Sequence, residues 1–478
     1  MTLRGSPTDT GGGPAARGAA RALRKRFDGD VLAPGDDGYD AARLGWNRTI
    51  DSHPAVIAVV GSVADVRTAV RVARDHDLPL AVQATGHGVV AAADGALLLR
   101  TGRLAGLHVD PVRRVARVGP GVVWDDVNRA AERHGLGALA GRCASVGVIG
   151  YTLGGGTGWL SRRFGYAADN AIRAEVVTAD GRLVHAGADE HPDQFWALRG
   201  GGGNFGVVTS LEFRLHPAPA IWGGQSLHPV ERVAAVFDAY RSWAPGEPDE
   251  LNSAVLVLRL PSAPGVPEPL RGRQVLSVRA FHLGDEASGR RALAPLLDVA
   301  GPPLHDGLAT RPFSAASAAT NGPDVPPIAL RQDVEFFHDL PVDATAAVVD
   351  AGAAPGSPTA FVELRHWQGA ISRPPADAGP AGARRVPFSV MAVAPYPAPD
   401  RRPVDAYLDR LSARLAPYAT GEAFLNLLTD PTRTGDAFTA DDHRRLTVVK
   451  AAWDPDNLFR MHHNVLPAAP APRPRSTP

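Results

Sequence analysis

The sequence of 478 residues contains a single cysteine, Cys143, and only two lysines, Lys25 and Lys450. One cysteine excludes an intramolecular disulfide framework. No apolar run approaches the roughly 18 residues that a membrane-spanning helix needs. The first residues carry charges but lack the apolar stretch of a secretory signal. We therefore expect a cytoplasmic protein that has no membrane partner.

An excess of charge of one sign is also absent, because 50 Lys and Arg residues balance 50 Asp and Glu residues. A balanced chain with scattered basic residues has no electrostatic footprint for nucleic acid. The adjacent His462 and His463 would point to opposite faces of an extended segment, and no H-E-x-x-H motif is present. We therefore expect no nucleic-acid partner and no metal. We expect the protein to be a monomer or a homodimer.

Glycine, in contrast, is concentrated around the cysteine. The stretch GRCASVGVIGYTLGGGTG, residues 141–158, has seven glycines in eighteen residues, and VQATGHG, residues 82–88, places His87 between two more. Glycine lacks a Cβ and accepts positive φ, so such loops allow the backbone to approach a flat or anionic group closely. Thiolate and imidazole are the soft nucleophiles that capture an electrophilic carbon. The pair predicts a cofactor site.

These motifs resemble the berberine bridge enzyme-like FAD-linked oxidases, which have the vanillyl-alcohol oxidase fold with a PCMH-type FAD-binding domain. Many members bind the flavin twice, through a histidine to its 8α-methyl carbon and through a cysteine to its C6. The resemblance continues through residues 174–186, 193–215 and 454–459. It implies a bicovalent FAD on His87 and Cys143, whose two tethers would raise the flavin redox potential.

The loops and the resemblance together predict a set of cofactor contacts. Tyr151 stands where family members place a polar ring beside the flavin pyrimidine, and residues 207–208 stand near the adenine half. The expected cofactor-binding residues are Gln83, Ala84, Thr85, Gly86, His87, Gly88, Val89, Gly141, Cys143, Val146, Gly147, Gly150, Tyr151, Thr152, Gly158, Val207, Val208 and Asn426.

A second glycine motif suggests a different cofactor. Gly201, Gly203 and Gly206 satisfy G-x-G-x-x-G, the fingerprint of a Rossmann dinucleotide site. That fingerprint needs a strand before the glycines and a helix after them. Here the glycines follow a predicted helix, 193–198, and precede a predicted strand, 207–215. The context therefore argues against an NAD site.

Apolar periodicity predicts an α+β fold with two domains. Further predicted strands are 55–60, 80–83, 96–99, 104–109, 114–118, 253–260, 274–281 and 360–366, and further helices are 62–75 and 123–134. Ser62 and Asp65 form a capping box at the start of a helix. The strands after residue 221 predict an antiparallel sheet covered by helices.

The predicted domains are discontinuous in sequence. We expect a flexible leader (1–40), a PCMH-type FAD-binding domain (41–220), a substrate-binding domain (221–425), a segment returning to the FAD domain (426–466) and a disordered, proline-rich tail (467–478).

The sequence offers three candidates for the catalytic base. Relatives that oxidise sugars carry two tyrosines for this role, but the matching positions here are Thr157 and Phe424. A base must lie within hydrogen-bond reach of the substrate hydroxyl. Strand alternation predicts that Glu363 shares one face with Arg365 while His366 faces the other way. Glu363, His366 and Tyr396 are the candidates.

The resemblance implies an FAD-dependent oxidase that removes two electrons from an alcohol or amine carbon of a small or medium natural-product-like molecule. Dioxygen would be the acceptor and peroxide the product, as expected of an enzyme of secondary metabolism. The missing tyrosines leave open a redox-neutral cyclisation or rearrangement on a covalent flavin. A non-catalytic binding protein of the same fold is a third hypothesis. Release of peroxide during turnover would distinguish the oxidase from the other two.

Overall fold

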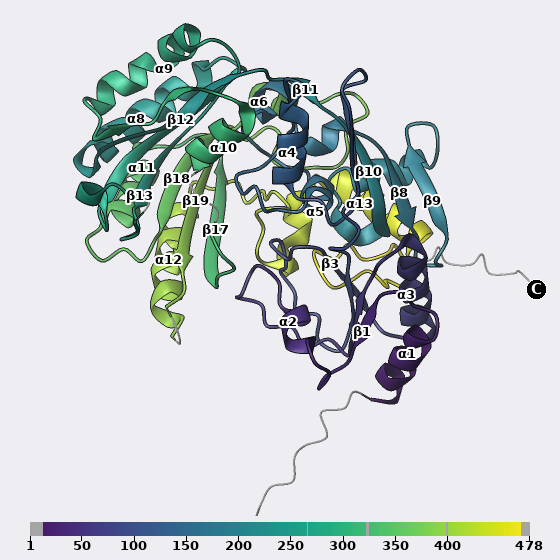
Figure 1. The fold of residues 1–478 in the computed structure, drawn as a ribbon. Coiled ribbons are helices and arrows are strands. Elements are labelled where there is room, and N and C mark those ends of the chain that lie inside the picture. Colours follow the sequence, from purple (N-terminus) through teal and green to yellow (C-terminus); the bar gives the residue numbers. More distant parts are fainter. Residues whose placement is uncertain (1–12, 265, 322–324, 398–399, 470–478) are drawn as a thin grey trace, which may run out of the picture.

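A computed structural model describes residues 13–264, 266–321, 325–397 and 400–469 of the chain. Figure 1 shows two bodies side by side. The first body is built on two small sheets and contains both ends of the described chain, whereas the second is one broad sheet with helices on its outer side. The architecture is α+β, as the sequence predicts.

The first sheet of the first body carries the chain toward His87. Its order is β1 (Asp30–Leu32), β2 (Val56–Val59), β4 (Leu97–Arg100) and β3 (Leu80–Gln83), and all neighbours except β1 and β2 are parallel. Helix α3 (Val63–Asp75) connects β2 to β3. Its predicted capping box is confirmed, because the Ser62 hydroxyl accepts from Asp65 N at 3.1 Å and the Asp65 carboxylate accepts from Ser62 N at 3.1 Å.

The second sheet of the first body supports the Cys143 segment. Its order is β5 (Leu107–Asp110), β6 (Val115–Val118), β10 (Val207–Arg214), β8 (Ala171–Val177) and β9 (Leu183–Gly187), and every pairing is antiparallel. An apolar core joins this sheet to α4 (Trp124–Glu132), α5 (Val148–Leu153), α7 (Pro192–Leu198) and α13 (Ala440–Trp453).

The structure differs from the predicted flexible leader. Residues 1–12 lie outside the described residues, but α1 (Pro14–Arg24) is a packed helix and β1 pairs with β2. Ala16, Ala19, Ala20 and Leu23 recur at helical spacing and are buried against α3 and the first sheet. Residues 14–32 therefore belong to the first body.

The second body is one antiparallel sheet. Its order is β15 (His305–Asp306), β12 (Ile221–Pro229), β14 (Gln274–His282), β13 (Leu251–Arg259), β18 (Phe361–His366), β19 (Phe388–Pro395) and β17 (Leu330–Phe337), with β16 (Ala309–Arg311) also paired to β12. The predicted strands 253–260, 274–281 and 360–366 are confirmed within one or two residues.

The two faces of this sheet have different surroundings. Helices α8 (Val233–Trp243), α9 (Glu286–Ala300), α11 (Val342–Ala353) and α12 (Arg402–Leu415) cover the outer face, onto which Val255 and Val257 project. Ala254 and Leu256 alternate with them and pack against Trp159 and Leu139 of the first body. We call this second side the inner face. Figure 1 shows the first body on that side.

Short elements complete the described chain. They are α2 (Tyr39–Arg43), β7 (Leu136–Gly137), α6 (Ser161–Phe164), η1 (Ala167–Asn170), η2 (Gly202–Phe205), β11 (His216–Pro217), η3 (Val230–Arg232), η4 (Ala244–Gly246), η5 (Glu268–Leu270), α10 (Phe313–Asn321), η6 (Gly369–Ser372) and η7 (Pro431–Ala437). In the part of the chain that the structure describes, no helix is long and apolar enough to cross a bilayer.

After α12 the chain returns to the first body. Helix α13 packs against α7 and η2, and the Lys450 ammonium donates to Asn204 O at 2.9 Å. Leu458 and Phe459 enter the apolar core beneath the first sheet. Segments more than 200 residues apart thus form one core. The predicted disordered tail lies outside the described residues from residue 470 onward.

Candidate functional site

The His87 loop begins where β3 ends at Gln83. Gly86 has φ +79°, and a Cβ there would lie 2.5 Å from Gly45 Cα, so this turn requires glycine. The His87 imidazole is held on two sides. Its Nδ1 lies 3.0 Å from Thr85 Oγ1, and the Trp46 ring stacks on it at 4.5 Å between centroids. The imidazole is therefore oriented by its neighbours rather than left to rotate.

The Cys143 loop runs from β7 to α5 and is fixed to the start of α4. Asp125 N donates to Ala144 O at 2.9 Å, and Trp124 N donates to Val146 O at 3.1 Å. Val146 N donates to Cys143 O at 3.3 Å, which makes a tight turn directly after the thiol. Backbone bonds thus set the position of Cys143.

The two loops meet, although 56 residues separate His87 from Cys143 in the sequence. Ser145 Oγ lies 3.4 Å from His87 Nε2. A Cβ on Gly147 would lie 3.6 Å from Thr85 Oγ1. The fold therefore brings the imidazole loop and the thiol loop to one place.

Tyr151 lies beneath the glycines that follow the cysteine. A Cβ on Gly141 would lie 2.7 Å from the Tyr151 ring, and one on Gly156 would lie 2.4 Å from it, so both must be glycine. The Tyr151 hydroxyl donates to Leu139 O at 3.0 Å, and burial raises the Tyr151 pKa. The phenol stays neutral.

Asn426 reaches the same glycines from the returning C-terminal part of the chain. Its Oδ1 accepts from Gly156 N at 2.8 Å, and its Nδ2 donates to Tyr151 O at 3.1 Å. Thr152, the residue after Tyr151, is buried and donates its hydroxyl to Val148 O at 2.8 Å. Asn426 therefore fixes the glycine run, and Thr152 belongs to the interior of α5.

Glu363 reaches the Cys143 loop from the inner face of the broad sheet. It forms an ion pair with Arg142, the residue directly before the cysteine, and only 2% of Glu363 is exposed. Burial favours a raised pKa for Glu363, but Arg142, Arg365 and Arg279 outweigh burial and hold that pKa below its ordinary value. Glu363 is therefore a carboxylate at neutral pH.

The sequence matches the FAD binding domain family over residues 54–187 and the berberine and berberine-like family over residues 423–466. (R)-6-Hydroxynicotine oxidase of Paenarthrobacter nicotinovorans is 29% identical over 470 residues, which cover 92% of this chain and 97% of that protein. The FAD-linked oxidoreductase YvdP of Bacillus subtilis is 28% identical over 466 residues, covering 93% and 99%. The chain is thus similar over more than nine-tenths of its length to FAD-linked oxidases and carries both the FAD-binding and the berberine-like segments. It is an FAD-dependent oxidoreductase.

Solved structures agree with this assignment. The crystal structure of 6-hydroxy-D-nicotine oxidase from Arthrobacter nicotinovorans has a TM-score of 0.79 at 27% identity and covers 92% of this chain and 98% of its own. Berberine bridge enzyme from Eschscholzia californica has a TM-score of 0.81 at 19% identity, with coverage of 95% and 99%, and supports the fold alone. The fold is that of the PCMH-type flavoenzymes.

The residues of the two loops fit the FAD of this family. Gly88 and Gly150 are exposed, and a Cβ on either would meet nothing within 4 Å, so open space adjoins the His87 loop and the first turn of α5, which follows the Cys143 loop. A Cβ on Gly158 would instead lie 1.8 Å from Ala140 O, because that glycine allows two backbone segments to touch. Open space beside two oriented nucleophiles suits a flat ring.

Val207 and Val208 lie at the start of β10, and both side chains are buried in apolar cores. In the described chain, β6 pairs with β10 only from Leu211 onward, so the first residues of β10 have no strand on that edge. Any contact of these valines with FAD would therefore use their backbone. Gln83, Ala84 and Val89, also predicted contacts, flank the His87 turn, where the Gln83 side chain packs against Gly45 and Gly86.

The structure does not bring His366 or Tyr396 to the Cys143 loop. His366 Nδ1 lies 2.9 Å from Glu247 Oε1 and 3.0 Å from Arg162 Nη1, in a buried network. The Tyr396 hydroxyl donates to Asp405 Oδ1 at 2.6 Å on the outer face. Both were predicted as catalytic candidates, but in the structure their side chains bond to these partners and not to the Cys143 loop. Glu363 is the candidate that faces the loop.

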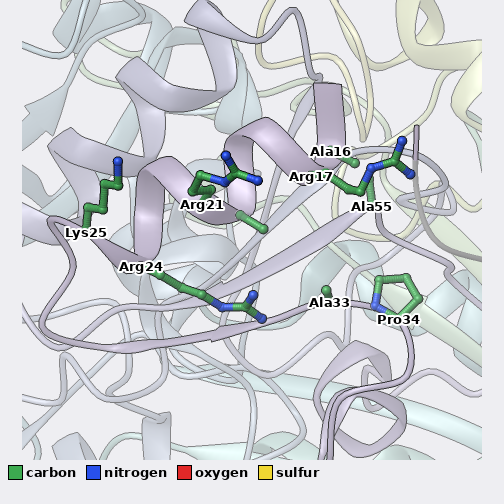
Figure 2. A pocket seen from close by; sticks show the side chains of 9 residues that line it. Ala16, Arg17, Arg21, Arg24, Lys25, Ala33, Pro34 and Ala55 are labelled. Carbon is green, nitrogen blue, oxygen red and sulfur yellow. The ribbon is translucent and has the colours of Figure 1, made fainter. Parts of the chain in front are cut away.

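A groove elsewhere on the first body is separate from this site. Figure 2 shows it along α1, where its volume is about 420 Å³ and its lining includes Arg17, Arg21 and Arg24. It adjoins β1, whereas the His87 loop follows β3 at the opposite edge of the same sheet. Within the described residues, no group of three or more metal-ligating side chains is present.

Proposed function

We propose that this enzyme is an FAD-dependent oxidase that removes two electrons from an alcohol or amine carbon of a small or medium natural-product-like substrate. Dioxygen is the acceptor and hydrogen peroxide the product. FAD is attached covalently through both His87 and Cys143. The observation that carries the proposal is the meeting of the His87 and Cys143 loops, together with the pairing of Glu363 to Arg142, the residue before the cysteine.

Bound FAD supplies a two-electron acceptor that dioxygen can regenerate. Around it, this chain's residues orient the substrate and move its proton. The ionised Glu363 would accept the proton of the substrate hydroxyl or amine group as the carbon is oxidised. Arg142 holds the Glu363 carboxylate in place through their ion pair. The name of the relative (R)-6-hydroxynicotine oxidase, a protein acting on a small nitrogen heterocycle, supports the small-substrate reading.

A redox-neutral cyclisation or rearrangement is the second candidate, and one observation favours it. Phe424 replaces a family tyrosine, and its ring packs against Tyr166 and Trp367 in a buried cluster. The other tyrosine position is Thr157. A panel of alcohols and amines separates the candidates, because an oxidase releases one peroxide for each product molecule. Product formed without peroxide or oxygen uptake favours the redox-neutral reaction.

Glu363→Gln is expected to slow flavin reduction by a substrate found in that panel about 10²–10⁴-fold, the usual contribution of a general base. The amide keeps the shape of the side chain but accepts no proton. The Glu363 pKa lies below 4.5, the ordinary value for a glutamate. The wild-type rate should therefore stay constant as the pH falls to 4.5 and should decrease only at lower pH. Stopped-flow absorbance of the flavin measures both quantities.

Glu335→Gln is the matched control, because Glu335 lies in β17 of the same sheet and its cross-strand partner, Val390, belongs to the outer-face core. It should reduce at the wild-type rate. Equal rates for wild type and Glu363→Gln, with flavin fully bound in both, would exclude Glu363 as the base.

Val146→Leu is expected to slow reoxidation of the reduced enzyme by dissolved oxygen about tenfold, which corresponds to about 1.4 kcal/mol in the barrier. In this family the residue three positions after the flavin-linked cysteine influences oxygen access, and a longer leucine accompanies dehydrogenases. Val146 packs at the edge of the first-body core, directly after the thiol turn. Stopped-flow mixing of photoreduced enzyme with oxygen needs no substrate.

Val146→Ile retains the branched side chain and should reoxidise like wild type. Two results would count against an oxidase: an unchanged rate in Val146→Leu, or wild-type enzyme that reoxidises no faster than free reduced flavin.

A further inference from the structure

The inner face of the broad sheet carries an unusual number of buried cations. Cross-strand pairing places Arg279 of β14 opposite Ala254 of β13, which in turn pairs with Arg365 of β18. Residues paired across a sheet share one face. The two arginines are therefore two strands apart, about 10 Å along the row, and both belong to the inner face.

Arg279 is 5% exposed, and its Nε has no hydrogen-bond partner among the described residues. Burial, followed by the charge of Arg142, lowers the pKa of Arg279 to about 9, so the guanidinium remains charged at neutral pH. A buried donor without a partner costs about 1–3 kcal/mol, and more when it is charged. The fold thus keeps a charged, unsatisfied donor on this face.

The other two arginines have partners. Arg365 donates to Asn252 Oδ1 at 3.2 Å and to Gly158 O at 3.3 Å, and it lies over the Trp159 ring at 4.5 Å. Arg142 pairs with Glu363. Arg365 is therefore oriented by hydrogen bonds to neutral groups, and neither of these hydrogen-bond partners, Asn252 and Gly158, is a carboxylate.

The local charge does not balance. Among the described residues, Glu363 is the carboxylate whose charge acts most strongly on both Arg279 and Arg365, raising the pKa of each. Three guanidinium groups thus face one carboxylate. Buried charge of one sign is costly unless it is paired. A ligand that brings a negative charge would supply the missing partner.

We propose that the active site selects substrates that carry a carboxylate group, which the Arg279 guanidinium binds with Arg365 beside it. Guanidinium groups bind carboxylates through paired N–H donors. The inference rests on the proposed function, because it assigns the substrate class of the same site. Glu363 keeps its ion pair with Arg142 and its role as proton acceptor, since the ligand carboxylate pairs with Arg279.

Titration of the flavin-containing enzyme with matched acids and amides tests this inference without turnover. The probes are benzoate with benzamide, phenylacetate with phenylacetamide, and hexanoate with hexanamide, followed by flavin difference spectra and by calorimetry. At least one acid should bind about tenfold or more tightly than its amide, as expected for a charge-assisted hydrogen bond. Arg279→Met should remove this preference while affinity for the amide stays within about twofold.

Two further variants control for folding and charge. Arg279→Lys should retain part of the preference for acids. Arg259→Met should behave like wild type, because Arg259 is at the end of β13, donates to Ser357 O at 3.2 Å and alternates onto the outer face.

Equal affinities within all three pairs, or no binding of any acid, overturn the inference. If Arg279→Met changes the flavin reduction potential but not the affinity for acids, the Arg279 charge stabilises the reduced flavin and does not bind a substrate carboxylate. This result would also overturn the inference. The proposed function can fail separately. If acids bind but are not oxidised, the anion site is supported and the oxidase is not. If neutral alcohols are oxidised and acids are not preferred, the oxidase is supported and the anion site is not.

Discussion

Protein carrying both His87→Ala and Cys143→Ala is expected to release all of its flavin when it is denatured in acid or detergent. Wild-type protein and each single variant should stay yellow on the polypeptide, because one bond suffices to retain the cofactor. The reason is that imidazole and thiol are the nucleophiles on two loops that meet through the 3.4 Å contact of Ser145 Oγ with His87 Nε2. Flavin fluorescence on denaturing gels and intact mass measure the attachment.

Ser145→Ala is the matched control for these variants. It removes a side chain that touches the His87 ring but takes away neither nucleophile. Both bonds should form in this variant. Colourless denatured wild-type protein would disprove the bicovalent attachment, and complete release from either single variant would reduce it to one bond.

Local signals in the sequence predicted the elements that carry the site. The Ser62 and Asp65 box specified the start of α3, and the run 80–83 became β3 without a shift of either end. Alternation along 361–366 separated Glu363 from His366 correctly, because a strand has only two faces. Such signals need only the neighbouring residues.

The arginines of the inner face illustrate what could not be predicted. An arginine at position 279 reads locally as one polar residue in an apolar strand. Its position beside Arg365 depends on β14 pairing with β13 and on β13 pairing with β18. Strands β13 and β18 are more than 80 residues apart in the sequence. No local pattern encodes such a register. The role of Arg142 could not be predicted either, because its partner Glu363 is 221 residues away in the sequence.

The leader was misjudged for a different reason. Gly and Arg are frequent near α1, and they concealed a helical repeat of small apolar residues, Ala16, Ala19, Ala20 and Leu23. Alanine buries little area for each residue, so the pattern is weak by hydrophobicity although its spacing is regular. The spacing alone would have predicted the helix.

A chain that ends at Ala419 is expected to bind no FAD and to fold poorly, because the lost part completes the first body. Lys450 Nζ donates to Asn204 O, to Phe459 O at 3.1 Å and to Asp454 Oδ2 at 2.6 Å, all in the interior. The same truncation removes Asn426, which fixes the glycine run after Cys143. Apolar cores lined by residues of α13 and residues 458–465 would open to water.

The comparison that isolates this effect is a chain ending at Ala469, which retains every contact named above and should become fully flavinylated. A point change gives a graded version. Lys450→Met leaves the Asp454 carboxylate buried without its cation, so unfolding should become easier by about 3–5 kcal/mol, the cost of breaking a buried pair. Urea unfolding followed by flavin fluorescence measures the loss. Soluble, fully flavinylated protein from the chain ending at Ala419 would show instead that residues 41–220 hold the cofactor without the returning segment.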